Sequence, residues 1–525
     1  MGVTRTTRPE GVSAGSRSRR RCLGRDALDF SRVSDRTDPS LPGGAAAPLR
    51  LVDVQSAVAA ELDRIGPVID ELGDRFAAAG HELALVGGPV RDAMLGRRSN
   101  DLDFTTSARP DVTDKILRAW GNAWWDMGRD FGTIGCRKGD WVVEVTTYRS
   151  EAYDPDSRKP DVQYGDTLAG DLGRRDFTVN AMAVRLPGRE LEDPYGGLMD
   201  LAHGVLRTPG RPEDSFSDDP LRMMRAARFA AQLGFAPAPE VVAAMTAMAE
   251  RIEIISAERV RDELVKLVCA PRPRLGLELL VETGLAARVL PELPALKLER
   301  DEHHRHKDVY EHTLTVLEQA IDLESRLSED GGPDFVSRFA ALMHDVGKPK
   351  TRRFIDDGTV TFHHHDAVGA KLTRKRMKAL RFSNDDIDAV SQLVEQHLRF
   401  HGYGTGEWTD SAVRRYVRDA GDQLERLHVL TRADCTTRNK RKADRLRRTY
   451  DDLEARIARL AEAEELASIR PDLDGNQIME ILGVPPGRVV GEAYGFLLEQ
   501  RLDNGPMSEA EATAALRAWW AERGS

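Results

Sequence analysis

A chain of 525 residues is too long for one hydrophobic core, so we expect several domains. Its 41% hydrophobic and 31% charged residues are typical of a soluble globular protein, and no apolar run is long enough to cross a bilayer. The net charge of -10 does not exclude a nucleic-acid partner, because local basic runs contact phosphates.

The first 50 residues are rich in Arg, Ser, Gly and Pro and carry a basic cluster at Arg17–Arg21. No apolar segment follows this cluster, so we expect no cleavable signal and interpret the arm as disordered. Absence of a CxxC pair argues against a disulfide framework and a zinc finger, and it favours a reducing cytoplasm. The four cysteines are Cys22, Cys136, Cys269 and Cys435.

Residues 56–80 have apolar side chains at helical spacing and end at Gly80, a suitable C-cap. Strand-like runs that alternate with helical stretches follow at 83–86, 102–105, 132–136 and 141–148. From Pro220 onward the pattern is amphipathic helix, interrupted by a predicted hairpin over 353–362 around Asp357-Gly358. The sequence therefore predicts an α+β protein with a small mixed-sheet head and a long all-α body.

Two carboxylates follow a glycine-rich turn in the head. Gly87–Pro89 separates a predicted strand from a predicted helix, where paired glycines and a helix N-terminus favour a triphosphate. Asp101 and Asp103 are two apart in a predicted strand, so they share a face, with the intervening apolar residues on the other. Adjacent anions repel, so the pair indicates divalent cations and a nucleotide. Glu144 is a candidate third carboxylate of a two-metal site, the alternative being a surface residue.

These residues resemble the signature of the polymerase-β nucleotidyltransferase superfamily, and further motifs follow in order. They are Arg174–Ala181, resembling RRDFT-x-NA, then Asp193–Gly197, Asp218–Arg222 and Ser256–Val260. The series is similar to that of class II CCA-adding tRNA nucleotidyltransferases and bacterial poly(A) polymerases, although Asp218 replaces the usual Glu. The resemblance implies a polymerase-β-like head that uses Mg²⁺ at Asp101 and Asp103. The nucleotide-binding residues that it implies are Gly88, Arg91, Arg175, Asp219, Arg222, Arg225 and Arg228.

Asp219 and Arg222 are three apart, so we expect them on one face of a helix that Arg225 and Arg228 continue. A carboxylate accepts hydrogen bonds from an exocyclic amine, and a guanidinium donates to ring nitrogens or carbonyl oxygens. Cytosine and adenine both present an amine beside a ring-nitrogen acceptor, whereas guanine and uracil reverse this pattern. The pair is predicted to select CTP and ATP, and the two later arginines to hold the triphosphate.

A second metal site is predicted in the helical body, where histidines and aspartates occur in or after several predicted helices. Their pattern resembles the HD phosphohydrolase superfamily, in which imidazoles and carboxylates bind one or two metal ions. The resemblance implies Mn²⁺, Ni²⁺ or Mg²⁺ as the metal, cyclic or terminal phosphates of RNA ends as candidate substrates, and Lys348 as a phosphate contact. The implied ligands are His312, His344, Asp345 and Asp434, with His365 and His397 as candidate additions.

The predicted domains follow the order of these motifs. They are a disordered basic arm (1–50), the nucleotidyltransferase head (51–207), a helical neck that selects the nucleotide and binds RNA (208–298), an HD domain (299–440) and a tRNA-binding helical tail (441–525). Basic runs at Arg222–Arg228, Arg414–Arg418 and Arg438–Arg448 are the candidate phosphate-contacting surfaces.

Together these features predict a cytoplasmic, monomeric enzyme that adds CCA to the tRNA 3′ end from CTP and ATP and releases pyrophosphate, with an additional HD phosphohydrolase activity possible. Neither a membrane nor DNA is expected as a partner. Two alternatives stay open. One is a poly(A) polymerase or A-adding enzyme of the same fold, and the other is an HD phosphohydrolase with a non-catalytic, RNA-binding head.

Overall fold

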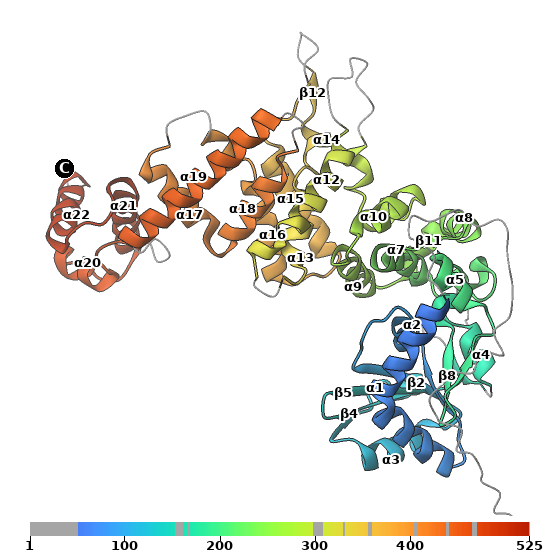
Figure 1. The fold of residues 1–525 in the computed structure, drawn as a ribbon. Coiled ribbons are helices and arrows are strands. Elements are labelled where there is room, and N and C mark those ends of the chain that lie inside the picture. The colour runs from blue at the N-terminus through green and yellow to red at the C-terminus, as the bar shows by residue number, and fades with distance from the viewer. Residues whose placement is uncertain are drawn as a thin grey trace, which may run out of the picture. The chain divides into compact units, whose positions relative to one another are not determined.

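A computed structural model describes residues 51–152, 161–165, 167–297, 308–328, 331–354, 360–403, 408–436, 440–464 and 470–523. This described chain forms two compact units, the first ending at His203 and the second beginning at Gly204 (Figure 1). The basic arm, Cys22 and the Asp357-Gly358 turn lie outside the described residues.

The first unit contains a seven-stranded mixed sheet in the order β3-β4-β5-β2-β1-β8-β9. Its strands are β1 (Leu83–Val86), β2 (Asp101–Thr106), β3 (Ala123–Trp125), β4 (Thr133–Lys138), β5 (Trp141–Thr147), β8 (Ala183–Leu186) and β9 (Glu190–Glu192). β2 and β5 pair in parallel, and the other neighbours are antiparallel. β6 (Arg149–Ala152) and β7 (Asp161–Tyr164) pair as antiparallel strands. The predicted mixed-sheet head is confirmed.

Helices pack on both faces of this sheet. They are α1 (Leu51–Ala78), α2 (Gly88–Met94), α3 (Pro110–Trp120), α4 (Leu168–Gly173) and α5 (Gly197–His203), with short 3-10 turns η1 (Arg129–Phe131) and η2 (Thr178–Asn180). Ala84 and Val86 of β1 form a cluster with Leu168 and Leu172 of α4. Because side chains alternate along a strand, the intervening leucines of β1 face the side that α1 covers. One face of the head is therefore closed by α1, and the other carries α4.

The second unit is almost entirely helical. Its first helices are α6 (Pro212–Asp218), α7 (Leu221–Leu233), α8 (Pro239–Met248), α9 (Ala257–Val268), α10 (Pro273–Glu282) and α11 (Ala286–Val289), with 3-10 turns η3 (Ala249–Ile254) and η4 (Pro294–Leu296). Two-residue strands β10 (Val205–Leu206) and β11 (Ala236–Pro237) pair in parallel. The predicted hairpin is confirmed in its two strands, β12 (Arg353–Phe354) and β13 (Val360–Thr361), which are antiparallel.

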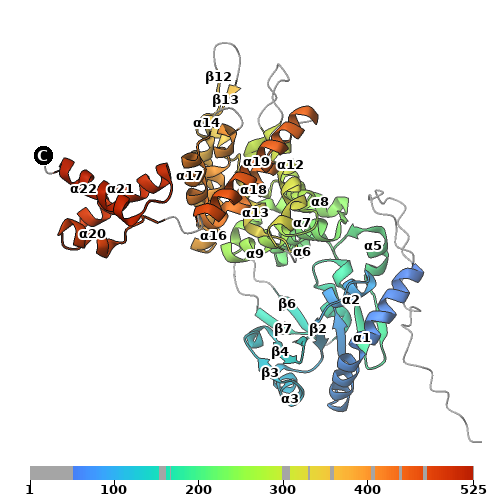
Figure 2. The same ribbon diagram turned by 60° about the vertical axis from the view of Figure 1, so that its left-hand side comes forward.

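A cluster of helices around α13 forms the middle of this unit. They are α12 (Val309–Asp322), α13 (Phe335–Met343), α14 (Lys348–Thr351), α15 (His365–Ala379), α16 (Asn384–Gln396), α17 (Asp410–Ala420), α18 (Leu424–Ala433) and α19 (Lys440–Glu464), with turns η5 (Glu324–Arg326), η6 (Arg399–Gly402) and η7 (Gly421–Gln423). Phe339, Leu342 and Met343 of α13 are all fully buried, because α12, α16 and α18 pack around this apolar helix. In Figure 2, α19 lies beside α12 and α18.

The last helices, α20 (Gly475–Leu482), α21 (Arg488–Asn504) and α22 (Glu509–Arg523), share a small core of their own. Asp474 caps α20, accepting hydrogen bonds from the backbone of Asn476 and Gln477. None of the helices within the described ranges is long and apolar enough to span a membrane. Cys136, Cys269 and Cys435 are free thiols.

The expectation that Asp219 and Arg222 share a helix face is wrong. Asp219 follows the end of α6 with an extended backbone (φ -141°, ψ 99°), and α7 begins only after Pro220. Proline fixes its own φ and disfavours helical geometry in the residue before it, so Asp219 stays outside the helix. Arg222 alone lies in the first turn of α7.

Helices α7 and α10 approach so closely that a glycine is required between them. A Cβ on Gly276 would overlap the backbone carbonyl of Ala227, whereas one on Gly495 of α21 would meet nothing. We predict that Gly276→Ala destabilises the protein by about 1–3 kcal/mol. Gly495→Ala should stabilise it by about 0.5–1 kcal/mol, because alanine loses less backbone freedom on folding. Thermal melting followed by circular dichroism compares the two, and equal melting temperatures would contradict the close packing.

Candidate active site and metal centre

The three predicted carboxylates of the head lie on one face of the sheet. Asp101 and Asp103 are exposed in β2, while Leu102 and Phe104 between and after them are buried, as expected from alternation. Glu144 is exposed in β5 and stands directly opposite Asp103 in the parallel pairing. Directly opposed residues point to the same face, so adjacent strands bring the three acids together.

The electrostatics of Asp103 reflect this crowding. Desolvation by the surrounding protein raises its pKa, and the negative charges of Glu144 and Asp101 raise it further, while the Arg175 guanidinium lowers it. A carboxylate held ionised against two others gains most from a bound divalent cation. The donor set, three carboxylates on one face, therefore fits the hard oxygen-ligated metal that the sequence predicts.

The glycine turn before α2 brings backbone close to Arg175. Gly87 has φ 72°, a conformation that side-chain-bearing residues rarely adopt, and a Cβ there would lie 3.0 Å from Nη1 of Arg175. Pro89 stands in the first turn of α2, where its missing N–H needs no partner. The predicted strand and a proline in the first turn of the helix are confirmed, but α2 already begins at Gly88, so Gly87 alone forms the turn.

A buried acid that the sequence motifs did not single out positions Arg175. Asp171 of α4 is fully buried and accepts hydrogen bonds from Arg174 (Nη2, 2.8 Å), Arg175 (Nη2, 3.2 Å) and the Thr105 hydroxyl (3.2 Å). Burial raises the pKa of Asp171, but the Arg175 and Arg174 guanidinium groups lower it more, so it stays ionised. Asp171 stands four residues before Arg175 in the sequence, and this spacing was the available signal.

Arg91, for which a nucleotide contact is predicted, forms hydrogen bonds within the head. Its side chain is buried and donates hydrogen bonds to Asn180 Oδ1 (2.7 Å) and to the Asp92 carboxylate (2.8 and 3.0 Å). Asn180 in turn donates to Asp176 Oδ1 (3.0 Å). Arg91 thus joins the glycine-turn motif to the Arg174–Ala181 motif.

The structure gives Asp219 a partner that the sequence did not suggest. Its Oδ2 accepts a hydrogen bond from Arg259 of α9 (2.9 Å), and its Oδ1 accepts one from the backbone of Leu221 (3.1 Å). Arg222 is buried and donates to the Ser215 hydroxyl (2.9 Å). Arg259 belongs to the Ser256–Val260 motif, so that motif contacts the predicted selecting acid directly.

Arg225 and Arg228 both face Glu263 of α9. The Arg228 Nε donates to Glu263 Oε2 (2.6 Å), and Arg225 lies 4.0 Å from Glu263 Oε1. Glu263 is 4% exposed, so its charge is held by these arginines rather than by water. One carboxylate offsets only part of the positive charge of these two guanidinium groups.

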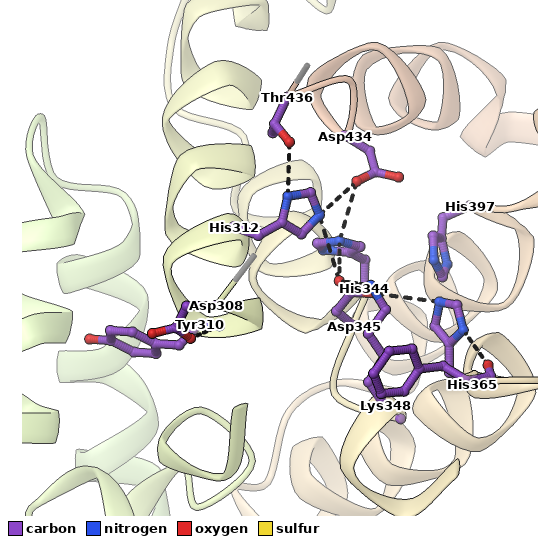
Figure 3. A network of polar contacts seen from close by, with 12 residues as sticks. Asp308, Tyr310, His312, His344, Asp345, Lys348, His365, His397, Asp434 and Thr436 are labelled. Atoms are coloured by element: carbon purple, nitrogen blue, oxygen red, sulfur yellow. Dashed lines mark hydrogen bonds and ion pairs between the residues drawn. The ribbon is translucent and has the colours of Figure 1, made fainter. Parts of the chain in front are cut away.

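The histidines of the HD region converge from several helices (Figure 3). Their Nδ1 atoms are each within hydrogen-bonding distance of a backbone carbonyl: His344 with Ala341 (2.8 Å), His365 with Phe362 (2.8 Å) and His397 with Val394 (2.6 Å). A carbonyl only accepts, so Nδ1 carries a proton, and in the neutral imidazole Nε2 then keeps the lone pair. All three Nε2 atoms are buried and make no hydrogen bond within the part of the chain that is described.

Asp345 joins these histidines into one centre. Its Oδ2 lies 3.2 Å from His344 Nε2 and 3.6 Å from His312 Nε2, and its Oδ1 lies 3.3 Å from His365 Nε2. Two ligand triads with mutual distances within 4.8 Å share Asp345, one with His312 and His344 and the other with His365 and His397. A carboxylate common to both triads is the arrangement expected of a bridging ligand.

Asp434 lies beside the first triad as a fourth candidate ligand. It follows α18 as its C-cap, and its Oδ1 lies 2.9 Å from His312 Nε2 and 3.6 Å from His344 Nε2. Thr436 fixes the other nitrogen of His312 at 3.1 Å. Unsatisfied Nε2 atoms facing two carboxylates fit a transition metal, because imidazole and carboxylate are its preferred ligands.

The charges of the centre also favour a cation. Burial by itself raises the pKa of Asp345, but the neighbouring His344 and His365 and the Lys348 ammonium hold it well below its usual range. Burial lowers the pKa of His397 to about 4, so this imidazole is neutral and free to bind metal at physiological pH. Lys348 donates to Asp345 Oδ2 at 2.5 Å, so its ammonium lies on the ligand set rather than free for a phosphate.

Three family models match successive parts of the chain. One described as "Poly A polymerase head domain" matches residues 83–207, one described as "Probable RNA and SrmB- binding site of polymerase A" matches 234–296, and one described as "HD domain" matches 309–465. The A-adding tRNA nucleotidyltransferase of Deinococcus radiodurans is 34% identical over 445 residues, which are 83% of this chain and 95% of that enzyme. The chain belongs to the tRNA nucleotidyltransferase and poly(A) polymerase family. It is a nucleotidyltransferase.

Two further relatives of this nucleotidyltransferase are CCA-adding enzymes. The CCA-adding enzyme of Levilactobacillus brevis is 44% identical over 208 residues, 39% of this chain and 51% of that enzyme. The crystal structure of the Bacillus stearothermophilus CCA-adding enzyme in complex with CTP has a TM-score of 0.63 and 26% identity over 86% of this chain and 97% of that chain. Nucleotidyltransferase heads and HD domains both generally use divalent metals.

The left-handed backbone of Gly87 gives a prediction for the head. Gly87→Ala forces both an unfavourable φ and a Cβ against Arg175, so we expect nucleotide transfer to fall by about 100-fold or more. Gly80→Ala, at φ 78° in open surroundings, carries the same backbone strain away from the carboxylates and should lose about 1–2 kcal/mol of stability but keep transfer. Melting temperatures of both variants measure the effect of backbone strain on stability. Steady-state transfer rates measure the effect on the active site. Equal rates would refute a role for the turn.

Proposed function

We propose that this nucleotidyltransferase builds the CCA end of tRNA, using CTP and ATP and releasing pyrophosphate. The observation that carries the proposal is the placement of Asp101, Asp103 and Glu144 on one sheet face beside the Gly87 turn. Support comes from the similarity to a CCA-adding enzyme solved with CTP. Cytosine and adenine are the two bases that one Asp–Arg pair accepts.

In this mechanism the residues of the head would bind the metal and the triphosphate. Asp101, Asp103 and Glu144 would hold Mg²⁺, which when bound supplies charge neutralisation at the reacting phosphate and at the attacking 3′-hydroxyl. Gly87 and Gly88 let the backbone approach the triphosphate, and Arg175 places a guanidinium beside Asp103. Arg91 would hold the two motifs together through Asn180.

Selection of the base belongs to the second unit. An ionised carboxylate has about four acceptor sites, so the bonds from Arg259 and Leu221 leave Asp219 able to accept an exocyclic amine. Arg222 would supply the complementary donor, and Arg225 and Arg228 the phosphate contacts. We propose that Arg259 orients Asp219 for this reading.

A second candidate product is a single terminal adenosine. It is favoured by the A-adding relative, which this chain matches along 95% of its length. The residues named for chemistry and selection would serve either product, because adenine and cytosine share the edge that Asp219 and Arg222 would read.

The deciding experiment offers the protein three tRNA acceptors, ending before CCA, after C and after CC, with CTP, ATP or both. Sequencing of the extended 3′ ends is expected to show CCA on the first acceptor and completion of the other two. Adenosine added to the CC-ending acceptor alone assigns the A-adding product, long adenosine tracts assign poly(A) synthesis, and no extension of any acceptor removes the nucleotidyl-transfer proposal. Asp103→Asn is the inactive control.

The Asp219–Arg259 ion pair gives a prediction about selectivity. Arg259→Leu leaves Asp219 without its side-chain partner, so we expect GTP and UTP misincorporation to rise by about 10-fold or more, since a discriminating hydrogen bond is worth about 1–3 kcal/mol. Arg259→Lys keeps a cation and should restore most of the discrimination. Competition between the four nucleotides on one tRNA acceptor measures both, and wild-type selectivity in Arg259→Leu would overturn this role.

We also propose that the HD centre is a metal-dependent phosphohydrolase that acts on cyclic or terminal phosphates. The supporting observation is the set of buried, unsatisfied Nε2 atoms around Asp345. His312, His344, Asp345 and Asp434 would hold one metal ion, and His365 and His397 a second across Asp345. Mn²⁺, Ni²⁺ or Mg²⁺ when bound would supply Lewis acidity at the phosphate.

Metal removal tests this second activity. With Mn²⁺ or Ni²⁺ the protein should hydrolyse 2′,3′-cyclic AMP, and His344→Ala should lower the rate by about 100-fold, since a ligand and its fixed tautomer are both lost. A chelator should abolish hydrolysis, and metal stoichiometry measured by mass spectrometry should fall in the variant. Transfer to tRNA serves as the folding control. If the protein binds Mn²⁺ and Ni²⁺ but hydrolyses the substrate with neither, the centre has a structural role.

A further inference from the structure

One side chain of α1 contacts the segment that leads into β2. Arg64 donates hydrogen bonds to the backbone carbonyl of Ser99 (Nη2, 2.6 Å) and to Asn100 Oδ1 (Nη1, 2.9 Å). Its guanidinium also lies 5.0 Å from the ring centroid of Trp141, the first residue of β5. Asp101, a candidate metal ligand, directly follows Asn100. A helix distant in sequence therefore holds the two residues that precede this ligand.

Glu61 orients the Arg64 guanidinium. Its buried carboxylate accepts two hydrogen bonds from Arg64, one from Nε to Oε2 (2.8 Å) and one from Nη2 to Oε1 (2.6 Å). Such paired bonds fix the plane of the guanidinium as well as its position. Oε1 of Glu61 also accepts a bond from the backbone N–H of Ser99 (3.4 Å). Burial raises the pKa of Glu61, but its bonds with Arg64 and Ser99 lower it more, so the carboxylate stays ionised.

The start of β2 needs such support because one neighbouring strand does not reach it. In the observed register, β1 pairs with β2 at Phe104–Thr106, whereas β5 pairs with β2 from Asp101 onward. Asp101 and Asp103 therefore lie on a part of the strand that, within the described head, only β5 holds by a backbone ladder. The end of a strand that is paired on one side opens more easily than its centre.

Hydrogen bonds carry the position of Ser99 and Asn100 into both strands. The Ser99 hydroxyl accepts from the Asp101 N–H (3.1 Å) and donates to the Asp101 carbonyl (3.0 Å). The Asn100 carbonyl accepts from the N–H of Val142 in β5 (3.0 Å), two residues before Glu144. The segment that α1 holds is thus the point at which both carboxylate-bearing strands begin.

A second ion pair on α1 provides a comparison. Arg75 donates two hydrogen bonds to one oxygen of Glu71, four residues earlier (3.0 and 3.3 Å), and the two side chains are 40% and 38% exposed. This is an ordinary surface pair within a helix. Arg64 is 27% exposed and directs two of its nitrogens to another segment of the chain. The helix alone explains the Arg75 pair, but it does not explain the contacts of Arg64.

We infer that Arg64, oriented by Glu61, is a positioning residue for nucleotidyl transfer, because it holds the segment that places Asp101 beside Asp103. The inference rests on the proposed function at the three carboxylates, and it names a residue outside the matched head domain of residues 83–207. The effect is geometric, since a displacement of about 1 Å in an active site can lower the rate by about 100-fold. Lysine at position 64 could pair with Glu61, but an ammonium lacks the planar fork that reaches several acceptors at once.

The test compares Arg64→Gln and Arg64→Lys with Arg75→Gln in the full-length protein. Arg75→Gln is the matched control, because it removes an ion pair elsewhere on the same helix. Steady-state transfer to a tRNA acceptor gives kcat and the KM for tRNA over a range of Mg²⁺ concentrations. Hydrogen exchange of the metal-free protein, followed by mass spectrometry, measures the opening of residues 99–103. Melting temperatures measure stability.

For Arg64→Gln we expect kcat to fall by about 10-fold, and the Mg²⁺ concentration for half the maximal rate to rise by about 10-fold, because the ligand geometry is disturbed. The KM for tRNA should stay within about 2-fold, since the loss falls on the reacting groups. Arg64→Lys should recover the melting temperature but not kcat. Exchange of residues 99–103 should be faster in both Arg64 variants, and unchanged in Arg75→Gln.

Full recovery of kcat in Arg64→Lys would overturn the inference, because charge alone would then suffice. Equal losses of rate in Arg64→Gln and Arg75→Gln would also overturn it, as a loss of helix stability explains both. If Arg64→Gln melts below the assay temperature, Arg64→Lys carries the comparison. If wild type extends no tRNA acceptor, the proposed function fails, and hydrogen exchange still decides whether Arg64 holds residues 99–103.

Discussion

Repulsion between carboxylates that share one sheet face is the constraint on which the head depends. Asp103 lies opposite Glu144 and two residues from Asp101, and its raised pKa records the cost of that proximity. The Arg175 guanidinium offsets part of this repulsion. Arg175 is itself positioned by a hydrogen bond to Asp171. The arrangement leaves the face short of positive charge, and a divalent cation together with a triphosphate fits that deficit.

The HD centre also places carboxylates close together, but here histidines surround them. Here the carboxylate Asp345 is buried, so the surrounding groups must be fixed before a metal arrives. Backbone carbonyls bind Nδ1 of His344, His365 and His397, and this fixes the orientation of each ring. In the head the candidate metal ligands lie on strands and are exposed to solvent. In the HD region most of them lie at helix ends and are buried.

The strands, the Gly87 turn and the histidine-bearing helices could be predicted from sequence, because alternation, glycine pairs and helical spacing are local signals. Which face of β2 is charged followed from Leu102 and Phe104 alone. The sequence did not predict the partners that tertiary packing brings together. They are Asp171 with Arg175, Glu263 with Arg225 and Arg228, and Arg259 with Asp219. The error over Asp219 was local, since Pro220 already disfavoured a helix at the residue before it. The separate roles and domain boundaries assigned from motifs remain predictions.

The place of Asp219 outside a helix bears on how one site can accept two bases. Cytosine and adenine share a hydrogen-bonding edge but differ in size, so a donor and acceptor locked three residues apart on one helix would fit only one of them well. Asp219 instead lies at the junction of α6 and α7, and Arg222 in the first turn of α7. Arg259 of α9 and the backbone of Leu221 both bind this carboxylate, so its position is set from two helices. Under the proposed function, the Asp–Arg pair would select against guanine and uracil, and the break that Pro220 introduces would set the spacing of acceptor and donor for pyrimidine and purine alike.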